Sequence, residues 1–153
     1  MKKLYVAISW VLVVICMGII FSLSAQNGEE STELSHSFVM AFFERLGLTI
    51  DEGFLRSCAH CLEFMGLSVL IFNAVYATSE TKLTPVFAFV GTVLYAVTDE
   101  IHQIFVPDRA FQLSDILVDS TGALIGVIAS LIILKIIFII KERGNKNGGI
   151  KTI

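Results

Sequence analysis

Charged residues, cysteines and prolines are all scarce in this chain, and each shortage argues against a class of protein. Only 16% of the 153 residues are charged and 55% are hydrophobic, whereas a soluble domain carries about 25% charged residues. Three cysteines are too few for a disulfide framework. A net charge of −3 does not point to a nucleic-acid partner. Two prolines leave the apolar runs largely unbroken, so we predict long helices facing lipid.

Familiar catalytic motifs are also missing. The sequence has no Ser-His-Asp pattern, no glycine-rich phosphate loop and no dinucleotide fingerprint. No tight ligand spacing such as H-E-x-x-H occurs, so we predict no metal site and leave any cofactor open. Cys58 and Cys61 have C-x-x-C spacing, but they fall in an apolar segment, and we interpret them, with Cys16, as packing residues.

The hydrophobic runs predict an all-α membrane protein, a bundle of four transmembrane helices in one domain. A run of ~20 apolar residues crosses a ~30 Å hydrocarbon core at ~1.5 Å rise per residue. For the first run a cleavable signal peptide is the alternative, but such peptides have apolar regions of only ~7–15 residues. The helices are expected at residues 4–23, 53–76, 84–104 and 115–140, within a single domain of residues 1–153.

The segment between the first two spans is polar and mildly acidic. Within it, Leu34, Phe38, Phe42 and Leu46 recur at helical spacing, which predicts a short amphipathic helix in the first outer loop. A partly ordered loop is the alternative. The run 49–52, Thr-Ile-Asp-Glu, fits a capping box, so we expect the second span to begin there.

Basic residues indicate the orientation in the membrane. In a four-span topology most lysines fall on one side, and Arg45, Arg56 and Arg109 fall on the other. Because positive charge in short loops marks the cytoplasmic side, we predict that both termini are cytoplasmic and that residues 99–114 face outward. The side rich in lysine holds Lys2, Lys3, Lys82, Lys141, Arg143, Lys146 and Lys151.

Polar side chains form a stripe on each of the last three predicted helices, near their outward ends. Helical spacing places the members of each stripe on one face. Ionisable groups at membrane depth usually face a bundle interior or a water-filled cavity, so we predict a common outward pocket. Gly122 and Gly126 would let the fourth helix approach its neighbours closely. The stripes are Arg56, His60 and Glu63; Asp99, His102 and Gln103; and Asp115, Asp119 and Gly122.

Each stripe also has a simpler interpretation. Arg56 could anchor the second helix at the headgroups, and His60 with Glu63 could be a pair that only orders the helices. The polar run from Asp99 to His102 could lie in the solvated end of a helix. Arg109 could pair with a nearby aspartate.

Three motifs carry a resemblance to a known family. Residues 56–64, R-S-C-A-H-C-L-E-F, resemble R-K-x-A-H-F-x-E-Y. Residues 99–109, D-E-I-H-Q-I-F-V-P-D-R, resemble D-E-x-H-Q-x-F-x-P-x-R, the most specific match. Residues 115–126 resemble D-x-x-x-[ND]-x-x-G-A-x-x-G. From Phe21 to Gly126 the chain thus resembles the VanZ family, small membrane proteins named after a teicoplanin-resistance protein. Ser57 replaces the usual lysine, Cys61 and Phe64 replace aromatic positions, and Asp108 replaces a common glycine.

The resemblance implies a helical membrane fold and a bacterial cell-envelope setting, and it gives no reaction. The leading hypothesis is an outward pocket that binds or modifies an envelope lipid or lipid-linked molecule, with a role in teicoplanin resistance. The alternatives are a non-catalytic binding or accessory protein and a proton-linked transporter, while the oligomeric state stays open. Candidate catalytic residues are Glu63, Asp99, Glu100 and His102, and candidate substrate-binding residues are Arg56, His60, Gln103, Arg109, Asp115 and Asp119.

Overall fold

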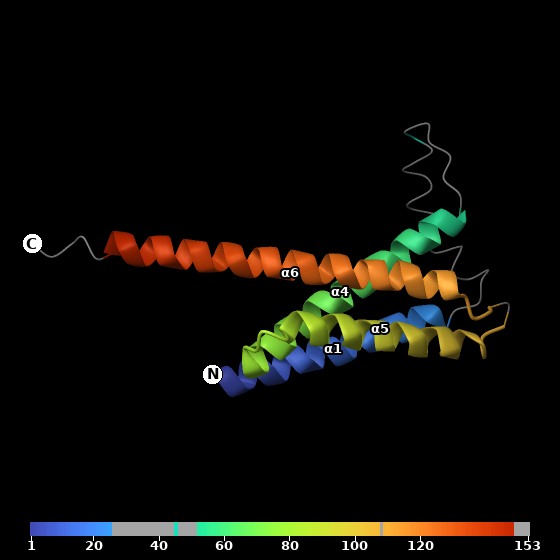
Figure 1. Ribbon diagram of the computed structural model, residues 1–153. Helices are drawn as coiled ribbons and strands as arrows, with labels where there is room; N and C mark the ends of the chain where they lie inside the picture. Colours follow the sequence, from blue (N-terminus) through green and yellow to red (C-terminus); the bar gives the residue numbers. More distant parts are fainter. Residues whose placement is uncertain (26–44, 46–51, 108, 149–153) are drawn as a thin grey trace, which may run out of the picture.

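The fold is known from a computed structural model, which describes residues 1–25, 45, 52–107 and 109–148. In this part of the chain four helices are each long and apolar enough to cross a membrane. The predicted all-α, four-span architecture is therefore confirmed. The helices, drawn in Figure 1, are α1 (Lys2–Ser24), α4 (Glu52–Ser79), α5 (Thr84–Gln103) and α6 (Leu113–Gly148).

The helix ends lie within a few residues of the expected positions, except at the C-terminal end of the fourth helix. Pro85 lies in the first turn of α5, where its missing N–H costs nothing. The fourth helix was expected over residues 115–140, whereas α6 begins at Leu113 and continues to Gly148. Lys, Glu and Arg, which follow Ile140, are good helix formers and sustain the helix beyond its apolar part. The predicted amphipathic helix and most of the capping box lie outside the described residues.

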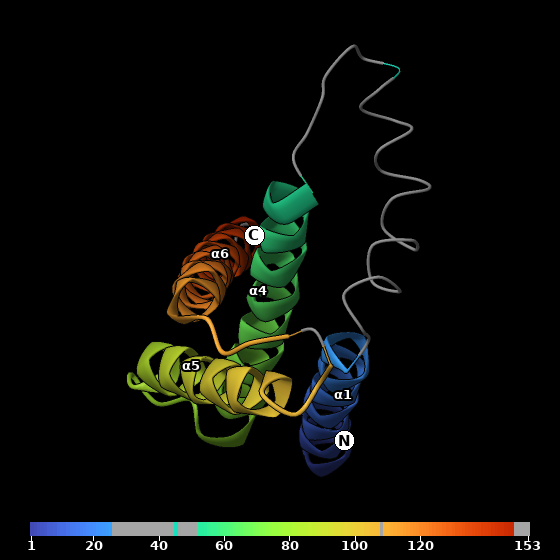
Figure 2. The same cartoon turned by 90° about the vertical axis from the view of Figure 1, so that its right-hand side faces the viewer.

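Helix α4 is the centre of the bundle and packs against each of the other three helices. Figure 2, viewed along the bundle, shows α1 and α6 on opposite sides of α4, with α5 beneath it. The side chains buried between the helices are mostly apolar or small, which lets the helices pack closely. They include Phe64, Leu67 and Ala74 of α4, Ala88 and Ala96 of α5, Val13 and Ile20 of α1, and Ala123 and Val127 of α6.

Two glycines of α6 fix its register on α4. A Cβ atom at Gly122 would overlap the carbonyl oxygen of Cys61, and one at Gly126 would lie 2.5 Å from the carbonyl oxygen of Met65. Each contact involves α4 backbone, which cannot rotate out of the way. The predicted close approach of the fourth helix is therefore confirmed, and it has the G-x-x-x-G spacing typical of helix pairs in membranes.

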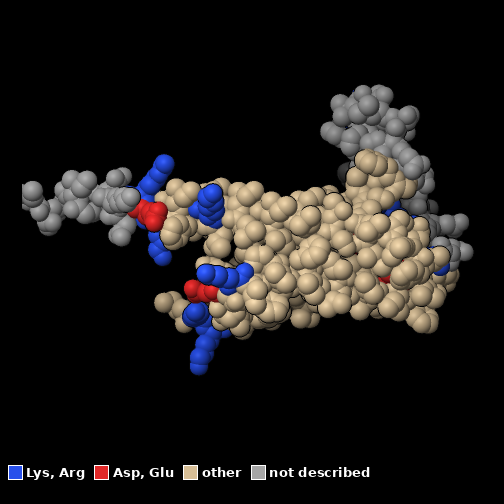
Figure 3. Space-filling model, in the orientation of Figure 1, with Lys and Arg blue, Asp and Glu red and all other residues tan. Residues whose placement is uncertain are grey.

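The outer surface of the bundle is apolar between two polar ends. Large side chains such as Leu62, Leu94 and Ile133 are more than half exposed, which suits a lipid-facing surface. Lys and Arg side chains gather at one end of the molecule (Figure 3). This end holds the start of α1, the connection between α4 and α5, and the last part of α6. We call this the basic end. The predicted site residues lie at the opposite end, which we call the polar end.

Candidate functional site

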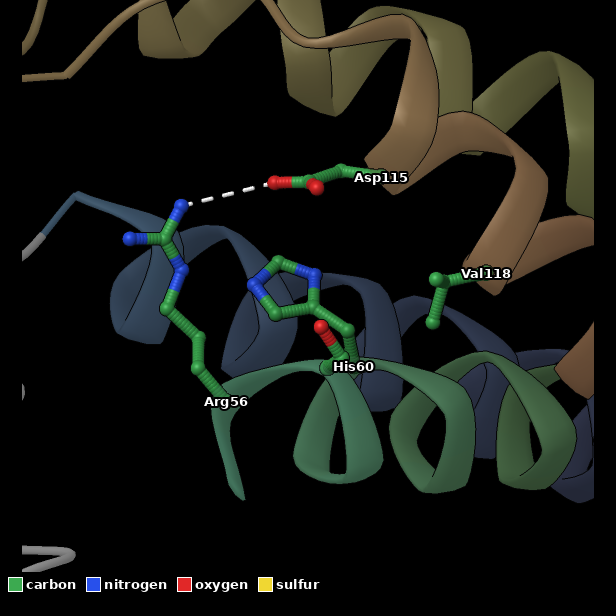
Figure 4. A pocket seen from close by; sticks show the side chains of 5 residues that line it. Arg56, His60, Asp115 and Val118 are labelled. Atoms are coloured by element: carbon green, nitrogen blue, oxygen red, sulfur yellow. Dashed lines mark hydrogen bonds and ion pairs between the residues drawn. The ribbon is translucent and has the colours of Figure 1, made fainter. Parts of the chain in front are cut away.

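A small pocket at the polar end lies between α4 and α6. Its lining includes Arg56, His60 and Asp115 (Figure 4). The Arg56 guanidinium lies 3.4 Å from the Asp115 carboxylate, with the two side chains 36% and 17% exposed. The pocket has a volume of about 10 Å³, which is room for one water molecule. One polar atom of a ligand could therefore enter, while the rest of that ligand would stay outside.

A histidine and an aspartate are paired behind this pocket. His60 Nδ1 lies 3.5 Å from Asp119 Oδ1, and Asp119 is fully buried. Asp119 is one helical turn before Gly122, so the close α4–α6 contact brings the two side chains together. Figure 4 shows a ring nitrogen of His60 turned toward Arg56. Because Nδ1 faces Asp119, the imidazole can present Nε2 to a group in the pocket.

A second polar contact joins α5 to the end of α1. Ser24 Oγ donates a hydrogen bond to Asp99 Oδ2 at 3.0 Å. The Gln103 amide donates to Ser24 Oγ at 3.1 Å and to Asp99 Oδ2 at 3.5 Å. All three side chains are buried. This contact therefore orients Asp99 and Gln103 and ties α1 into the site.

Glu100 holds the connection between α5 and α6. Its Oε2 accepts a 2.8 Å hydrogen bond from the backbone N–H of Gln112, and the carboxyl group is fully buried. Arg109 lies in the same connection and is partly buried. Burial and the neighbouring Arg56 guanidinium both lower the pKa of Arg109, while Asp115 opposes them. An arginine remains a cation despite such a shift, so two positive groups lie near one another at this end.

The remaining candidate residues lie at different places. Glu63 is half-buried and interacts electrostatically with His60, Asp99 and Asp119, so it lies among the three stripes. His102 instead faces α1, where its ring centroid is 4.1 Å from that of Phe21. It does not line the small pocket. The polar end thus brings most of the predicted residues together and places His102 at its edge.

Several buried carboxylate and amide oxygens lie at this end. Among the described residues, both oxygens of Asp119 and one each of Asp99, Glu100 and Gln103 have no hydrogen-bond partner. Buried polar atoms are rarely left without partners. These oxygens therefore suit protons or a ligand that carries hydrogen-bond donors. Within the described ranges, no three His, Cys, Asp or Glu side chains are arranged as metal ligands would be.

Two contributors to the site, Ser24 and Phe21, were not among the predicted residues, and both come from α1. Ser24 belongs to the buried face of α1, which also includes Ser9, Val13 and Ile20. These residues are spaced by about one or two helical turns, and this spacing is the sequence pattern that could have identified the buried face. The signal is hidden because α1 is apolar all round and its lipid-facing side looks the same as its buried side.

The polar end contains the described charged residues of all three sequence motifs, and the family comparison covers the same region. A model of the VanZ/LLP1 family matches residues 9–136. No curated protein and no solved structure matches the chain. The match extends over all four helices and includes every predicted site residue. The chain therefore belongs to the VanZ/LLP1 family and is a multi-pass membrane protein.

Proposed function

We propose that this protein acts at the bacterial cell envelope, where its polar end binds an anionic group of an envelope lipid or lipid-linked molecule. The observation that carries the proposal is the pocket of Arg56, His60 and Asp115, backed by the buried Asp119. The pocket admits a single polar atom beside an arginine and a histidine. That arrangement suits one phosphate oxygen or one attacking water.

The two arginines supply the affinity in this proposal. Arg56 is paired with Asp115 at 3.4 Å but remains 36% exposed, so an anion can reach its guanidinium. Arg109 lies near Arg56, where burial opposes its charge and Asp115, Asp99 and Glu100 favour it. An anionic group would offset that cost, and a guanidinium matches the geometry of phosphate. The hydrophobic part of the ligand would stay in the surrounding lipid, against the apolar surface.

His60 would move protons at the bound group. Asp119 faces Nδ1 of the ring, so the opposite nitrogen is oriented for transfer. Glu63, close to His60 and Asp119, would supply or remove a second proton. Asp99 and Glu100, hydrogen-bonded to Ser24 and Gln112 respectively, would hold α1 and the α5–α6 connection around the site. Hydrolysis or transfer at a lipid-linked phosphate or acyl group is the reaction class that we propose.

Binding can be tested with a matched pair of lipids. The purified chain would be titrated with a polyprenyl phosphate and with the corresponding polyprenol, which lacks the phosphate. We expect the phosphate to bind at least ~10-fold more tightly, and Arg56→Gln to remove most of that preference. Glu142→Gln, an exposed change on α6, is the control. Equal binding of the two lipids would disprove the anion site.

A role in glycopeptide resistance belongs to the same proposal, because the family takes its name from a teicoplanin-resistance protein. Teicoplanin and vancomycin susceptibility would be compared in a Gram-positive host at matched membrane expression. We expect the wild type to raise teicoplanin tolerance, and His60→Asn and Glu63→Gln to abolish it. Glu142→Gln should keep it. A non-catalytic binding protein would keep its tolerance in His60→Asn and Glu63→Gln. It would lose that tolerance only when binding itself is weakened, as in Arg56→Gln.

We also propose that the polar end faces outward, with both ends of the chain in the cytoplasm. Ala110 and Lys82 are exposed in the connections at the two ends of the bundle. In a chain without its native cysteines, a membrane-impermeant maleimide should label Ala110→Cys on intact cells. Lys82→Cys should react only after the cells are permeabilised. The reverse pattern would overturn the orientation and, with it, an extracellular substrate.

Proton-linked transport has less support from the described residues. Away from the polar end, their buried polar side chains are hydroxyls, not carboxyls or imidazoles. Most donate to a backbone carbonyl of their own helix, as Thr92 does to Ala88 at 2.8 Å. A proton relay through a membrane usually runs along Asp, Glu and His. The buried acids therefore suit a site at one membrane face better than a path across the membrane.

A further inference from the structure

A wide groove opens at the basic end, far from the polar site. It has α4 as its floor, and α1 and α6 as its walls. Figure 3 shows the molecule hollowed here, between the extended part of α6 and the rest of the bundle. The volume is about 720 Å³, within the ~300–1,000 Å³ typical of small-molecule sites. The groove is thus large enough for part of a lipid.

The α6 wall of the groove is an apolar stripe that ends in positive charge. Leu131, Leu134 and Phe138 line the groove and recur at helical spacing. Leu131 and Phe138 are 42% and 62% exposed, and Leu134 packs on the core from the same face. Lys135 and Lys141 belong to the same wall. A hydrocarbon chain with an anionic head would match this sequence of apolar and basic side chains.

The charges in the groove do not balance. Three lysines and one glutamate line it, and the glutamate, Glu80, is 3.4 Å from Lys2. Glu80 is the one acidic side chain among the described residues that line the groove, and it is already paired with Lys2, so Lys135 and Lys141 add positive charge that the lining does not balance. Basic pockets between transmembrane helices at the cytoplasmic face are typical sites for anionic lipid headgroups.

Aromatic side chains place the basic rim at the level of the headgroups. Tyr5 and Tyr76 line the groove, and tyrosine gathers at the membrane–water interface. The Tyr5 hydroxyl donates to Asn73 at 2.7 Å, and Asn73 in turn donates to Ser9 at 3.1 Å. The floor near the rim is therefore polar, while the α6 wall is apolar. A lipid would find hydrogen-bonding groups near its head and apolar groups along its chain.

We propose that this groove binds one anionic glycerophospholipid, with its phosphate between Lys135 and Lys141 and one acyl chain along Leu131 and Leu134. The lipid would fill the space between α1 and α6 and hold these helices at a fixed separation. This site is separate from the polar end, and it binds a bulk membrane lipid. It would make the stability of the bundle depend on the headgroup charge of the bilayer.

The test compares two lipids on the full chain purified in detergent. Native mass spectrometry would count bound phosphatidylglycerol and phosphatidylcholine at equal concentrations. We expect one phosphatidylglycerol to be retained, and the combination of Lys135→Gln and Lys141→Gln to weaken its binding by about 30-fold, at roughly 1 kcal/mol per lysine. The matched control combines Lys3→Gln and Lys82→Gln, which removes two exposed charges from the same end outside the groove.

A second variant tests whether the acyl chain lies in the groove. It separates binding in the groove from a general attraction of the lipid to positive charge. Leu131→Trp should fill the groove and displace phosphatidylglycerol with every lysine intact. Equal retention of the two lipids, or equal weakening by the control pair, would overturn the proposal. A lipid-free dimer that Leu131→Trp converts to a monomer would also overturn it, because a second copy would then be the occupant.

Discussion

Replacing Gly122 by alanine should separate α6 from α4 and damage the polar site at the same time. The added methyl would overlap the carbonyl oxygen of Cys61 and lie 3.0 Å from its carbonyl carbon, whereas carbon atoms in contact are about 3.5–4.0 Å apart. The obstacle is backbone in a continuous helix, so no side-chain rotation can relieve it. The helices must therefore move apart, by about 1 Å at this level.

The net cost follows from two opposing effects. Overpacking of this kind costs about 1–3 kcal/mol. Alanine recovers up to about 1 kcal/mol because it is the better helix former. We expect a loss of about 1–2 kcal/mol in the free energy of unfolding. The same movement would pull Asp119, which lies one turn from Gly122, away from His60, now 3.5 Å distant. We therefore expect the variant to lose activity even at temperatures where it stays folded.

Gly66→Ala provides the matched control on the partner helix. A Cβ atom at Gly66 would meet no atom within 4 Å, so only the gain in helix propensity remains. Thermal unfolding in one detergent should show a midpoint lower by about 3–6 °C for Gly122→Ala and unchanged or slightly higher for Gly66→Ala. If the two variants unfold at the same temperature, the close contact of α6 with α4 is not present in the membrane protein.

Two further predictions concern the hydrogen bonds at the polar end. Ser24→Ala removes the 3.0 Å hydrogen bond to Asp99 and should lower the free energy of unfolding by about 1–3 kcal/mol. The control, Ser22→Ala, changes an exposed hydroxyl and should shift the unfolding midpoint by less than ~1 °C. Similar losses in both variants would show that the Ser24 contact is not formed. Glu100→Ala should speed hydrogen exchange at the Gln112 amide by about 10–100-fold, because it deletes the 2.8 Å acceptor, and Glu100→Gln, which keeps an acceptor, should restore most of the protection.

The topology was predictable because long apolar runs leave few alternatives in a membrane. Helical spacing also predicted that Arg56 and His60 share a face, and that face lines the small pocket with Asp115. The predicted common pocket of three stripes is not seen in the described residues, because Asp99, His102 and Gln103 of α5 contact α1 instead. The end of α6 was not predictable, because lysine and glutamate permit a helix as readily as a tail, and only continuity with the preceding helix decides between them.

The details of the site depend on contacts between distant parts of the sequence. Ser24 and Asp99 are brought together by the packing of α1 on α5, which no local pattern encodes. His102 shares a face with Asp99 by spacing, yet it packs on Phe21, because a ring can turn away from its helical stripe toward an aromatic neighbour. Spacing therefore predicted which helix faces meet, but not which side chains touch.

The buried carboxyl of Asp119 allows function to be separated from folding. Neither oxygen has a hydrogen bond among the described residues, and Oδ1 only approaches His60 Nδ1 at 3.5 Å. So long a contact offsets little of the cost of burying a carboxylate. Asp119→Asn keeps the shape and removes the charge, so we expect an unfolding midpoint that is unchanged or raised by a few degrees, together with lost teicoplanin tolerance. A midpoint lowered as far as that of Gly122→Ala would identify Asp119 with His60 as a structural lock, and would favour a non-catalytic protein.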